Sequence, residues 1–357
     1  MSSRCSRRMV VALPWLMVPT LRSATSATAQ PVNPSGDDWI VSDPAGENVD
    51  PSLPSTLDEI LPTYPALTGF VVVRNGVIVS EHYDNGYGPD DRIDIRSVTK
   101  SVVGTLIGIA LERGDLASLD QTIGALIPDR IPDGADAATA GITIRSLLTM
   151  TSGLDWNYRT DYSRLEASDD PLSLTLSQPV VADQGSVYVY NSGGSHVLGV
   201  ILEAVTGRQL EGYADEVLFR PLGIERGRWR ETPQGDAIGG YGLFLTPRDM
   251  ARLGLLYLQE GRWNGDRLLP ADYIEAATSY QSDGDGTGGT PYGYQWWVTD
   301  ASGYDAFFAL GFGGQYIYVV PDLDLVVVAA VGFERQPVEL RSPRPIIEDV
   351  VIPLVGG

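Results

Sequence analysis

The chain has 357 residues, of which 43% are hydrophobic, and this is enough apolar material for two or three domain-sized units. Its formal net charge of −21 would repel phosphate backbones and anionic lipid surfaces, so nucleic-acid and membrane-surface roles are disfavoured. No apolar run reaches the roughly 20 residues that a membrane-spanning helix needs.

Residues 1–29 have the three-part layout of a secretory signal peptide. Arginines precede an apolar run, and a small-residue stretch ends at Ala29, where we expect cleavage; a disordered tail is the alternative. The mature chain would be periplasmic or extracellular, and the sequence does not separate general from twin-arginine export. Its charge would be 21 − 46 = −25, because the signal segment removes four of the 25 basic residues and no acidic one.

The first elements after this segment are a leader and a hairpin. Residues 30–54 are rich in Pro, Asp, Gly and Ser, and we expect them to form an extended leader. Two strand-like runs follow at 69–74 and 77–83. Asn75-Gly76 joins them, and this dipeptide between apolar runs is typical of a tight β-hairpin.

Lys100 is the only lysine among the 25 basic residues of the chain. Lysine can lose its proton when buried and arginine cannot, so a lone lysine indicates a task that needs a titratable amine. Ser97 lies three residues earlier, at the start of an apolar helical stretch over 101–111, which places both side chains on one helix face. The helix N-terminus favours an alkoxide and lowers the lysine pKa. The alternative is an ordinary N-cap serine beside a solvated lysine.

Residues 116–236 show helical periods broken by Gly and Pro loops, which predicts a mostly helical subdomain. Within it, Tyr188 and Tyr190 precede a helix beginning near Ser195. A phenol from this loop could take the proton of the Ser97 hydroxyl and pass it to a leaving group. A nearby ammonium would lower the phenol pKa, so the two groups could share one proton. Simple packing is the alternative.

Glycines dominate the approach to a late strand pair. Gly311, Phe312 and Gly313 form a strand edge that can come close to a ligand, and a backbone N–H there could join that of Ser97 in an oxyanion hole. A β-bulge is the alternative. The remaining expected elements are core segments at 239–245 and 249–259, strands at 316–320 and 325–331, and a final helix at 345–355.

Together these elements predict an α+β fold, with one antiparallel sheet made from both chain ends, helices packed on it and the site at the junction with a helical insertion. The expected division is a signal peptide at 1–29, a leader at 30–54, a sheet subdomain at 55–115 plus 237–357, and a helical subdomain at 116–236.

Cysteine and histidine are too scarce for several kinds of site. Cys5 is the only cysteine and precedes the expected cleavage point, which excludes disulfides and cysteine catalysis in the mature chain. His82 and His196 are too few for most zinc sites and leave little room for a Ser-His-Asp triad. An Asp- and Gly-rich segment at 283–288 lacks the closing glutamate of a calcium loop. We expect no metal and no cofactor.

The Ser-x-x-Lys pair of Ser97 and Lys100 resembles the first signature of the serine β-lactamase and penicillin-binding-protein superfamily. Segments 144–156 and 240–250 are similar to its class C-type, peptidase S12-like branch. Residues 149–156 and 313–315 look most like the 6-aminohexanoate-dimer hydrolase group of esterases and amidases. The resemblance covers roughly residues 36–356, and it implies a β-lactamase/transpeptidase-like fold and an acyl-enzyme mechanism.

The resemblance also implies site residues, with departures. The family's Tyr-x-Asn motif corresponds to Tyr190 and Ser192, so serine replaces asparagine. Its third motif corresponds to 309–311, where Ala309 replaces a cation, and Phe312 would supply the oxyanion N–H. These departures disfavour true β-lactamase or peptidoglycan peptidase activity. Glu166 lacks the residues that follow a class A-type deacylation base.

The function expected from the sequence is a secreted serine hydrolase of esters or small amides, with Ser97 as nucleophile and Lys100 and Tyr190 moving its proton. Its partner would be a small-molecule substrate; the oligomeric state stays open. Rival interpretations are a class C-type β-lactamase or D-Ala-D-Ala carboxypeptidase, an acylable binding or sensor protein, and an acyltransferase. Four aromatic residues are expected either to line an apolar substrate pocket or to pack in the core: Trp156, Tyr158, Trp296 and Trp297.

Overall fold

The computed structural model describes residues 33–34, 39–225, 227–284, 289–332 and 340–357, which all belong to one unit, Pro31–Gly357. The expected signal peptide and Cys5 lie outside the described residues. So do residues 285–288 of the Asp- and Gly-rich segment.

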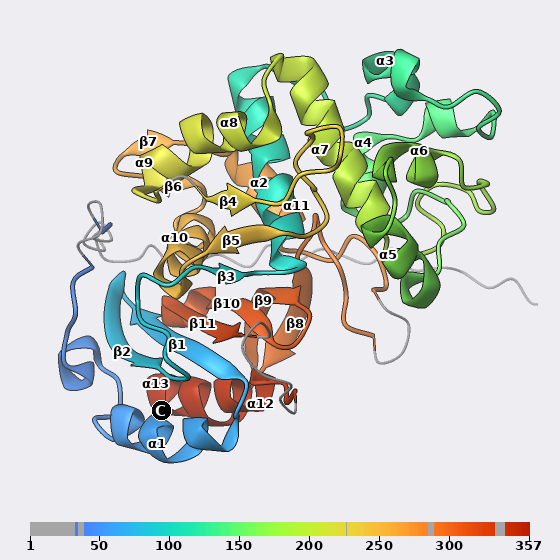
Figure 1. The fold of residues 1–357 in the computed structure, drawn as a ribbon. Helices are drawn as coiled ribbons and strands as arrows, with labels where there is room; N and C mark the ends of the chain where they lie inside the picture. The colour runs from blue at the N-terminus through green and yellow to red at the C-terminus, as the bar shows by residue number, and fades with distance from the viewer. Residues whose placement is uncertain (1–32, 35–38, 226, 285–288, 333–339) are drawn as a thin grey trace, which may run out of the picture. The chain divides into compact units, whose positions relative to one another are not determined.

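A six-stranded antiparallel sheet brings together strands from both ends of this unit (Figure 1). Phe70 of β1 lies opposite Ala329 of β11, more than 250 residues later in the chain. The predicted α+β architecture with one antiparallel sheet is therefore confirmed. The strand order is β2 (Val77–Tyr83), β1 (Leu67–Arg74), β11 (Leu325–Val331), β10 (Gln315–Val320), β9 (Tyr304–Gly311) and β8 (Trp297–Ala301).

Both faces of the sheet are covered, so its central strands are apolar on both sides. Val71 and Val73 face a core shared with α2 (Val98–Arg113) and α10 (Pro247–Leu258). Phe70 and Val72 face a second core against helices from the chain ends. Those helices are α1 (Leu53–Ile60), α12 (Arg344–Ile346) and α13 (Ile352–Gly356), the last two joined by a π-helical turn at Ile347–Val351.

Local turn chemistry explains the two hairpins that the sequence predicts. Asn75 and Gly76 both adopt positive φ, 52° and 84°, as a two-residue turn between β1 and β2 requires. β10 and β11 pair antiparallel around a 3-10 turn at Pro321–Leu323. β8 is not predicted from the sequence, and of β9 only the glycine end is.

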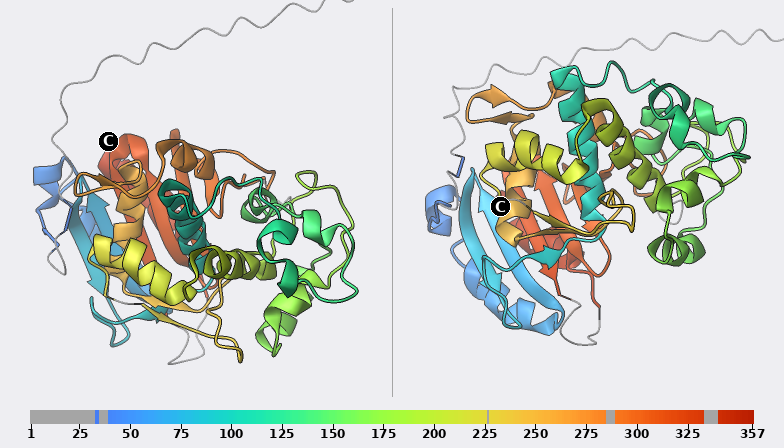
Figure 2. Two further views of the ribbon diagram at one scale, coloured as in Figure 1. Left: turned by 90° about the horizontal axis from the view of Figure 1, so that it is seen from above. Right: turned by 45° about the horizontal axis from the view of Figure 1, so that its top comes forward.

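The middle of the chain is mostly helical and lies to one side of the sheet in every view (Figures 1 and 2). Its longest helix packs against α2 and against several shorter helices of the same region. That helix begins at Ser192, three residues earlier than predicted, because the Asn191 side chain accepts a hydrogen bond from Gly194 N and caps it. The helices are α3 (Ile123–Leu126), α4 (Ile144–Leu148), α5 (Tyr158–Glu166), α6 (Pro171–Leu176), α7 (Ser192–Thr206), α8 (Leu210–Ala214) and α9 (Arg220–Leu222).

Smaller elements complete the described chain. β3 (Ile93–Asp94), β5 (Leu243–Leu245) and β4 (Arg228–Trp229) form a short antiparallel ribbon beneath the helices. α1 begins inside the segment expected as an extended leader, which also contains a 3-10 turn at Pro44–Glu47. Among the described residues, no helix has the length and apolarity to cross a membrane. The other elements are β6 (Arg262–Trp263), β7 (Asp266–Arg267) and α11 (Ala271–Ala277).

The packing of α10 on the sheet leads to a stability prediction. A Cβ added at Gly254 would lie 2.5 Å from Val326 Cγ1, so Gly254→Ala is expected to destabilise the protein by about 1–3 kcal/mol through overpacking. Gly212→Ala in α8 is the matched control, because no atom lies within 4 Å of its added Cβ. Urea unfolding should show the control unchanged or stabilised by up to about 1 kcal/mol. Equal midpoints for both variants would contradict the proposed close contact.

Candidate active site

Ser97 occupies the N-cap position of α2, three residues after the end of β3. α2 is buried from Val98 to Ala110 because its sequence is apolar on nearly every side. Lys100 lies one helical turn beyond Ser97, and its Nζ donates a hydrogen bond to Ser97 Oγ at 3.0 Å. The spacing predicted from the sequence therefore corresponds to direct contact between a hydroxyl and an amine.

Lys100 is almost completely buried, with 1% of its surface exposed. Its Nζ also donates to the carbonyl oxygen of Gly240 at 2.6 Å. Burial lowers the pKa of the amine to about 7, because the charged form loses its hydration. The pKa is lowered as predicted, but the cause in the structure is burial, whereas the sequence predicts an effect of the helix terminus.

Tyr190 brings a phenol from the helical region to this pair. Its ring centroid lies 4.9 Å from Lys100 Nζ. Burial raises the pKa of the phenol above its ordinary value, and the neighbouring Ser97 side chain offsets this only in part. The expectation that the ammonium would lower this pKa is therefore wrong. Near pH 7 the phenol is neutral, and the amine is the group that titrates.

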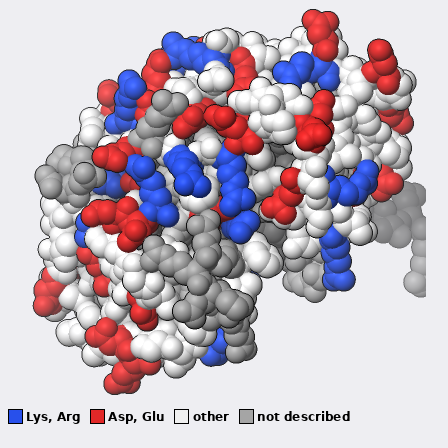
Figure 3. All heavy atoms as spheres, in the orientation of Figure 1, with Lys and Arg blue, Asp and Glu red and all other residues white. Residues whose placement is uncertain are grey.

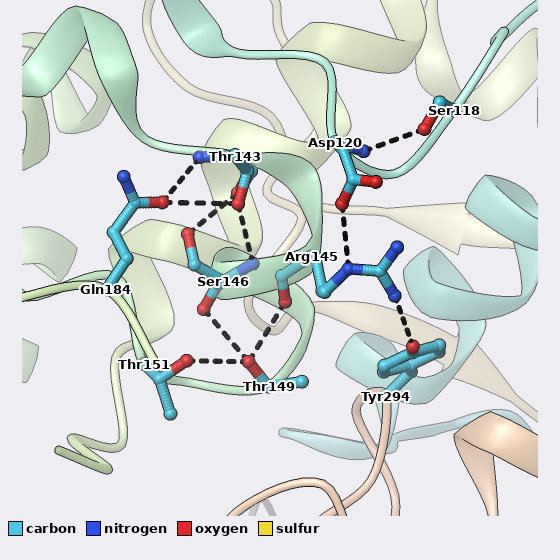
Figure 4. Close-up of polar contacts among 9 residues, drawn as sticks. All are labelled: Ser118, Asp120, Thr143, Arg145, Ser146, Thr149, Thr151, Gln184 and Tyr294. Carbon is cyan, nitrogen blue, oxygen red and sulfur yellow. Dashed lines mark hydrogen bonds and ion pairs between the residues drawn. The ribbon is translucent and has the colours of Figure 1, made fainter. Parts of the chain in front are cut away.

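The loop that carries Tyr190 is held by α4 and the residues after it. Val189 N donates to Met150 O at 2.8 Å, and Gly185 N donates to Thr151 O at 3.0 Å. Figure 4 shows how side chains brace this segment, including Arg145, which donates to Asp120 and to Tyr294 Oη at 2.8 Å each. The other bonds drawn there join Thr143 with Ser146 and Gln184, Thr149 with Arg145, Ser146 and Thr151, and Ser118 with Asp120.

Ser192 and Gly240 lie against each other beside the lysine. Ser192 is buried in the first turn of α7, and a Cβ on Gly240 would lie 2.4 Å from its carbonyl oxygen. A residue with a side chain would push this backbone apart. Glycine therefore lets the backbone come close enough for the Gly240 carbonyl to meet Lys100 Nζ.

The turn between β9 and β10 approaches the nucleophile segment from the sheet. A Cβ on Gly311 would lie 2.4 Å from Ile95 O, two residues before Ser97, so the strand end touches this backbone. Gly313 adopts φ 90°, which favours glycine. The Phe312 side chain is 60% exposed between them. Ala309, in the place of the family's cation, is completely buried.

The four predicted aromatic residues divide into two groups. Tyr158 meets the Tyr190 ring edge-on at 5.9 Å, and Trp297 stacks on that ring at 6.1 Å. Trp296 does not line a pocket, because its side chain is 1% exposed and packs in the core against Tyr257 at 4.5 Å. Trp156 is also buried, in a small separate cluster with Tyr241.

An open pocket of about 440 Å³ lies near this site, and one of the residues that line it is Tyr241, which follows Gly240 in the chain. Basic side chains gather over β3, β4 and β5 on this face, although the protein is acidic overall (Figure 3). Glu166, excluded above as a class A-type base, lines the same pocket and accepts a hydrogen bond from Tyr162 Oη at 3.1 Å. The other lining residues are Arg228, Trp229, Arg230, Glu231 and Ile238.

Gln295 is a buried residue that the sequence analysis missed. Its side-chain amide donates to Leu147 O at 3.1 Å and Leu148 O at 2.8 Å, and it accepts from Ser195 Oγ at 2.8 Å. Its own carbonyl accepts from Ser101 Oγ at 2.6 Å. One glutamine thus joins α4, α7 and α2, the helices around the site. No periodic pattern marks such a residue, because its partners are distant in sequence.

Neither histidine is hydrogen-bonded to Ser97, Lys100 or Tyr190, and each has other partners. His82 lies on β2, with Nε2 2.9 Å from Ser80 Oγ and Nδ1 3.1 Å from Asp58. His196 is buried in α7, where its Nδ1 accepts from Gly239 N at 3.4 Å, and burial lowers its pKa to about 4. Within the described ranges, no three His, Cys, Asp or Glu residues are grouped as a metal site.

The sequence profile of the family described as Beta-lactamase matches residues 63–347. The chain belongs to the beta-lactamase family. A 6-aminohexanoate-dimer hydrolase from Paenarthrobacter ureafaciens is 26% identical over 283 residues, which cover 72% of this chain and 71% of the relative. Esterase EstB from Burkholderia gladioli is 31% identical over 179 residues, 43% of this chain and 44% of that esterase.

Solved structures agree with this family assignment at the level of the fold. EstCE1, described as a hydrolase with promiscuous acyltransferase activity, superimposes with a TM-score of 0.65. The superposition covers 85% of this chain and 97% of EstCE1 at 18% identity, so it concerns the fold alone. The family match over residues 63–347 confirms the predicted superfamily resemblance.

Gln295→Ala is expected to lower the free energy of unfolding by about 2–4 kcal/mol, because three side-chain hydrogen bonds disappear and their buried partners lose solvation. Thermal and urea unfolding measure this change. Gln209→Ala, at an exposed glutamine before α8, should stay within about 0.5 kcal/mol of the parent. A Gln295 variant as stable as this control would show that the three helices do not depend on the amide.

Proposed function

We propose that the protein is a secreted serine hydrolase that cleaves esters or small amides through a covalent acyl-enzyme. The observation that carries the proposal is the contact of Lys100 Nζ with Ser97 Oγ at 3.0 Å, combined with an amine pKa of about 7. An amine with its ordinary pKa near 10.5 would be neutral in only about one molecule in 3,000 at pH 7. Buried Lys100 is neutral in about half of the molecules at that pH.

In the proposed first step, the Ser97 oxygen attacks the substrate carbonyl carbon while its proton passes to the neutral amine of Lys100. The carbonyl π electrons move to the oxygen, which the backbone N–H groups of Ser97 and Phe312 stabilise. Tyr190 donates its phenolic proton to the leaving group as the scissile bond breaks, and regains a proton from the Lys100 ammonium. Water then attacks the acyl carbon while its proton passes through Tyr190 to Lys100. The bond between the acyl carbon and Ser97 Oγ breaks, the Lys100 ammonium returns a proton to Ser97, and the acid leaves.

Two departures from the family motifs support esters and small amides rather than β-lactams. Ala309 offers no charge to a substrate carboxylate, and Ser192 is shorter than the asparagine usual at its position. The ring faces of Tyr158 and Trp297 beside Tyr190 provide apolar surface for a substrate. Two relatives are named as a 6-aminohexanoate-dimer hydrolase and an esterase, and these names describe hydrolysis of an amide and of esters.

The site assignment predicts where a serine-reactive probe binds. A fluorophosphonate should label Ser97, and Ser97→Ala should lose both labelling and turnover of short acyl esters, amino-acid oligomer amides or nitrocefin. Ser163→Ala, at an exposed serine of α5, should keep both. Peptide mass spectrometry locates the label. Label on another residue would overturn the assignment, rapid nitrocefin turnover would favour a β-lactamase, and stable acylation without turnover would favour a sensor.

The lowered amine pKa predicts a pH profile. Because only the neutral amine accepts the Ser97 proton, kcat/KM should rise as pH increases through about 7 and then level off. Lys100→Arg removes this neutral form and should reduce kcat/KM by about 10²–10⁴-fold. Stopped assays of ester hydrolysis from pH 5 to 9 measure both effects, with circular dichroism as the control for folding. A kcat/KM that still rises without a plateau at pH 9, or an active arginine variant, would contradict the mechanism.

A further inference from the structure

The residue before the nucleophile has an unusual backbone conformation. Arg96 adopts φ 52°, in the left-handed region that residues with side chains rarely occupy. Such a conformation persists only where surrounding contacts enforce it, and it is concentrated at functional sites. The direction in which Ser97 leaves this turn depends on it. The contacts of Arg96 therefore bear directly on the placement of the nucleophile.

Asp94 supplies the contacts that enforce this turn. Its side chain is only 3% exposed at the end of β3, and its Oδ1 accepts a hydrogen bond from Arg96 N at 2.9 Å. Its Oδ2 lies 3.5 Å from Arg96 Nε and 3.2 Å from Arg230 Nη2. A buried carboxylate between two guanidinium groups thus holds both the backbone and the side chain of Arg96.

The residues on either side of Arg96 are fixed by other bonds. Ile95 N donates to Leu243 O at 3.0 Å, and Ile95 O is covered by Gly311. On the helix side, Lys100 N donates to Ser97 O at 3.0 Å. With both neighbours held, the dihedral angles of Arg96 decide where Ser97 Oγ lies relative to Lys100 Nζ.

We propose that Asp94 is a positioning residue for Ser97: its carboxylate holds Arg96 in the left-handed conformation and thereby keeps Ser97 Oγ in contact with Lys100 Nζ. This inference rests on the proposed function of Ser97 as nucleophile. The positioning role differs from a purely structural role, in which Asp94 would only hold β3 against the end of β4 through its ion pair with Arg230. Replacing Arg96 by glycine distinguishes the two roles, because glycine adopts a positive φ without the help of a carboxylate.

A double-mutant cycle tests this separation, with the rate constant of fluorophosphonate labelling at Ser97 as the readout. Asp94→Ala should slow labelling at least tenfold and lower kcat more than it raises KM. Asp94→Asn keeps an oxygen that accepts the hydrogen bond from Arg96 N, so its labelling rate constant should stay within about threefold of the parent value. In an Arg96→Gly background, Asp94→Ala should reduce the labelling rate constant by less than about threefold. Arg92→Ala, which removes an exposed ion pair with Glu225, is the matched control.

The outcomes distinguish this inference from the proposed function. A parent protein that is not labelled at Ser97 contradicts the proposed function itself. A labelled parent with an equally reactive Asp94→Ala variant, or the same loss with and without Arg96→Gly, overturns only the positioning role. If Asp94→Ala alone does not fold, the double variant with Arg96→Gly should fold and be labelled. Failure of both to fold would assign Asp94 a purely structural role.

Discussion

The burial of one amine determines most of what this site can do. Lys100 lies inside a helix that is apolar on nearly every side, and its Nζ donates hydrogen bonds to the Ser97 hydroxyl and the Gly240 carbonyl. An ammonium in such surroundings loses hydration that two oxygens replace only in part. Its proton affinity therefore falls to the range in which a serine hydroxyl can be activated. The close packing of Gly240 against Ser192 is what brings the carbonyl within reach.

The rest of the fold brings distant segments to this amine. The sheet presents the Gly311 end of β9, the helical region presents Tyr190, and α2 presents Ser97. Gln295 lies where these parts meet and bonds to α2, α4 and α7 through a buried amide and its own backbone. A satisfied buried polar network of this kind specifies one arrangement, because any alternative leaves polar atoms without partners.

Local chemistry explains which features could be predicted from the sequence. The Asn75-Gly76 turn and the pairing of Ser97 with Lys100 depend on residues within a few positions, so dihedral preferences and helix spacing were sufficient. Gly240 is 140 residues from Lys100, and nothing in the sequence pairs them. Trp296 and Trp297 are adjacent, yet one packs in the core and the other against Tyr190, because neighbours in extended chain face opposite sides. The direction of the Tyr190 pKa shift could not be predicted from the sequence, because it depends on how deeply the fold buries the phenol, and burial outweighs the effect of Ser97.

The solitary lysine gives the protein a built-in spectroscopic reporter. Apart from the chain terminus, Lys100 Nζ is the molecule's only aliphatic amine, so isotope enrichment of lysine would produce a single side-chain resonance without any substitution. That resonance would report the protonation of the amine directly in the resting protein. It would also follow the same atom through acylation, because the amine touches the oxygen on which the acyl group would form.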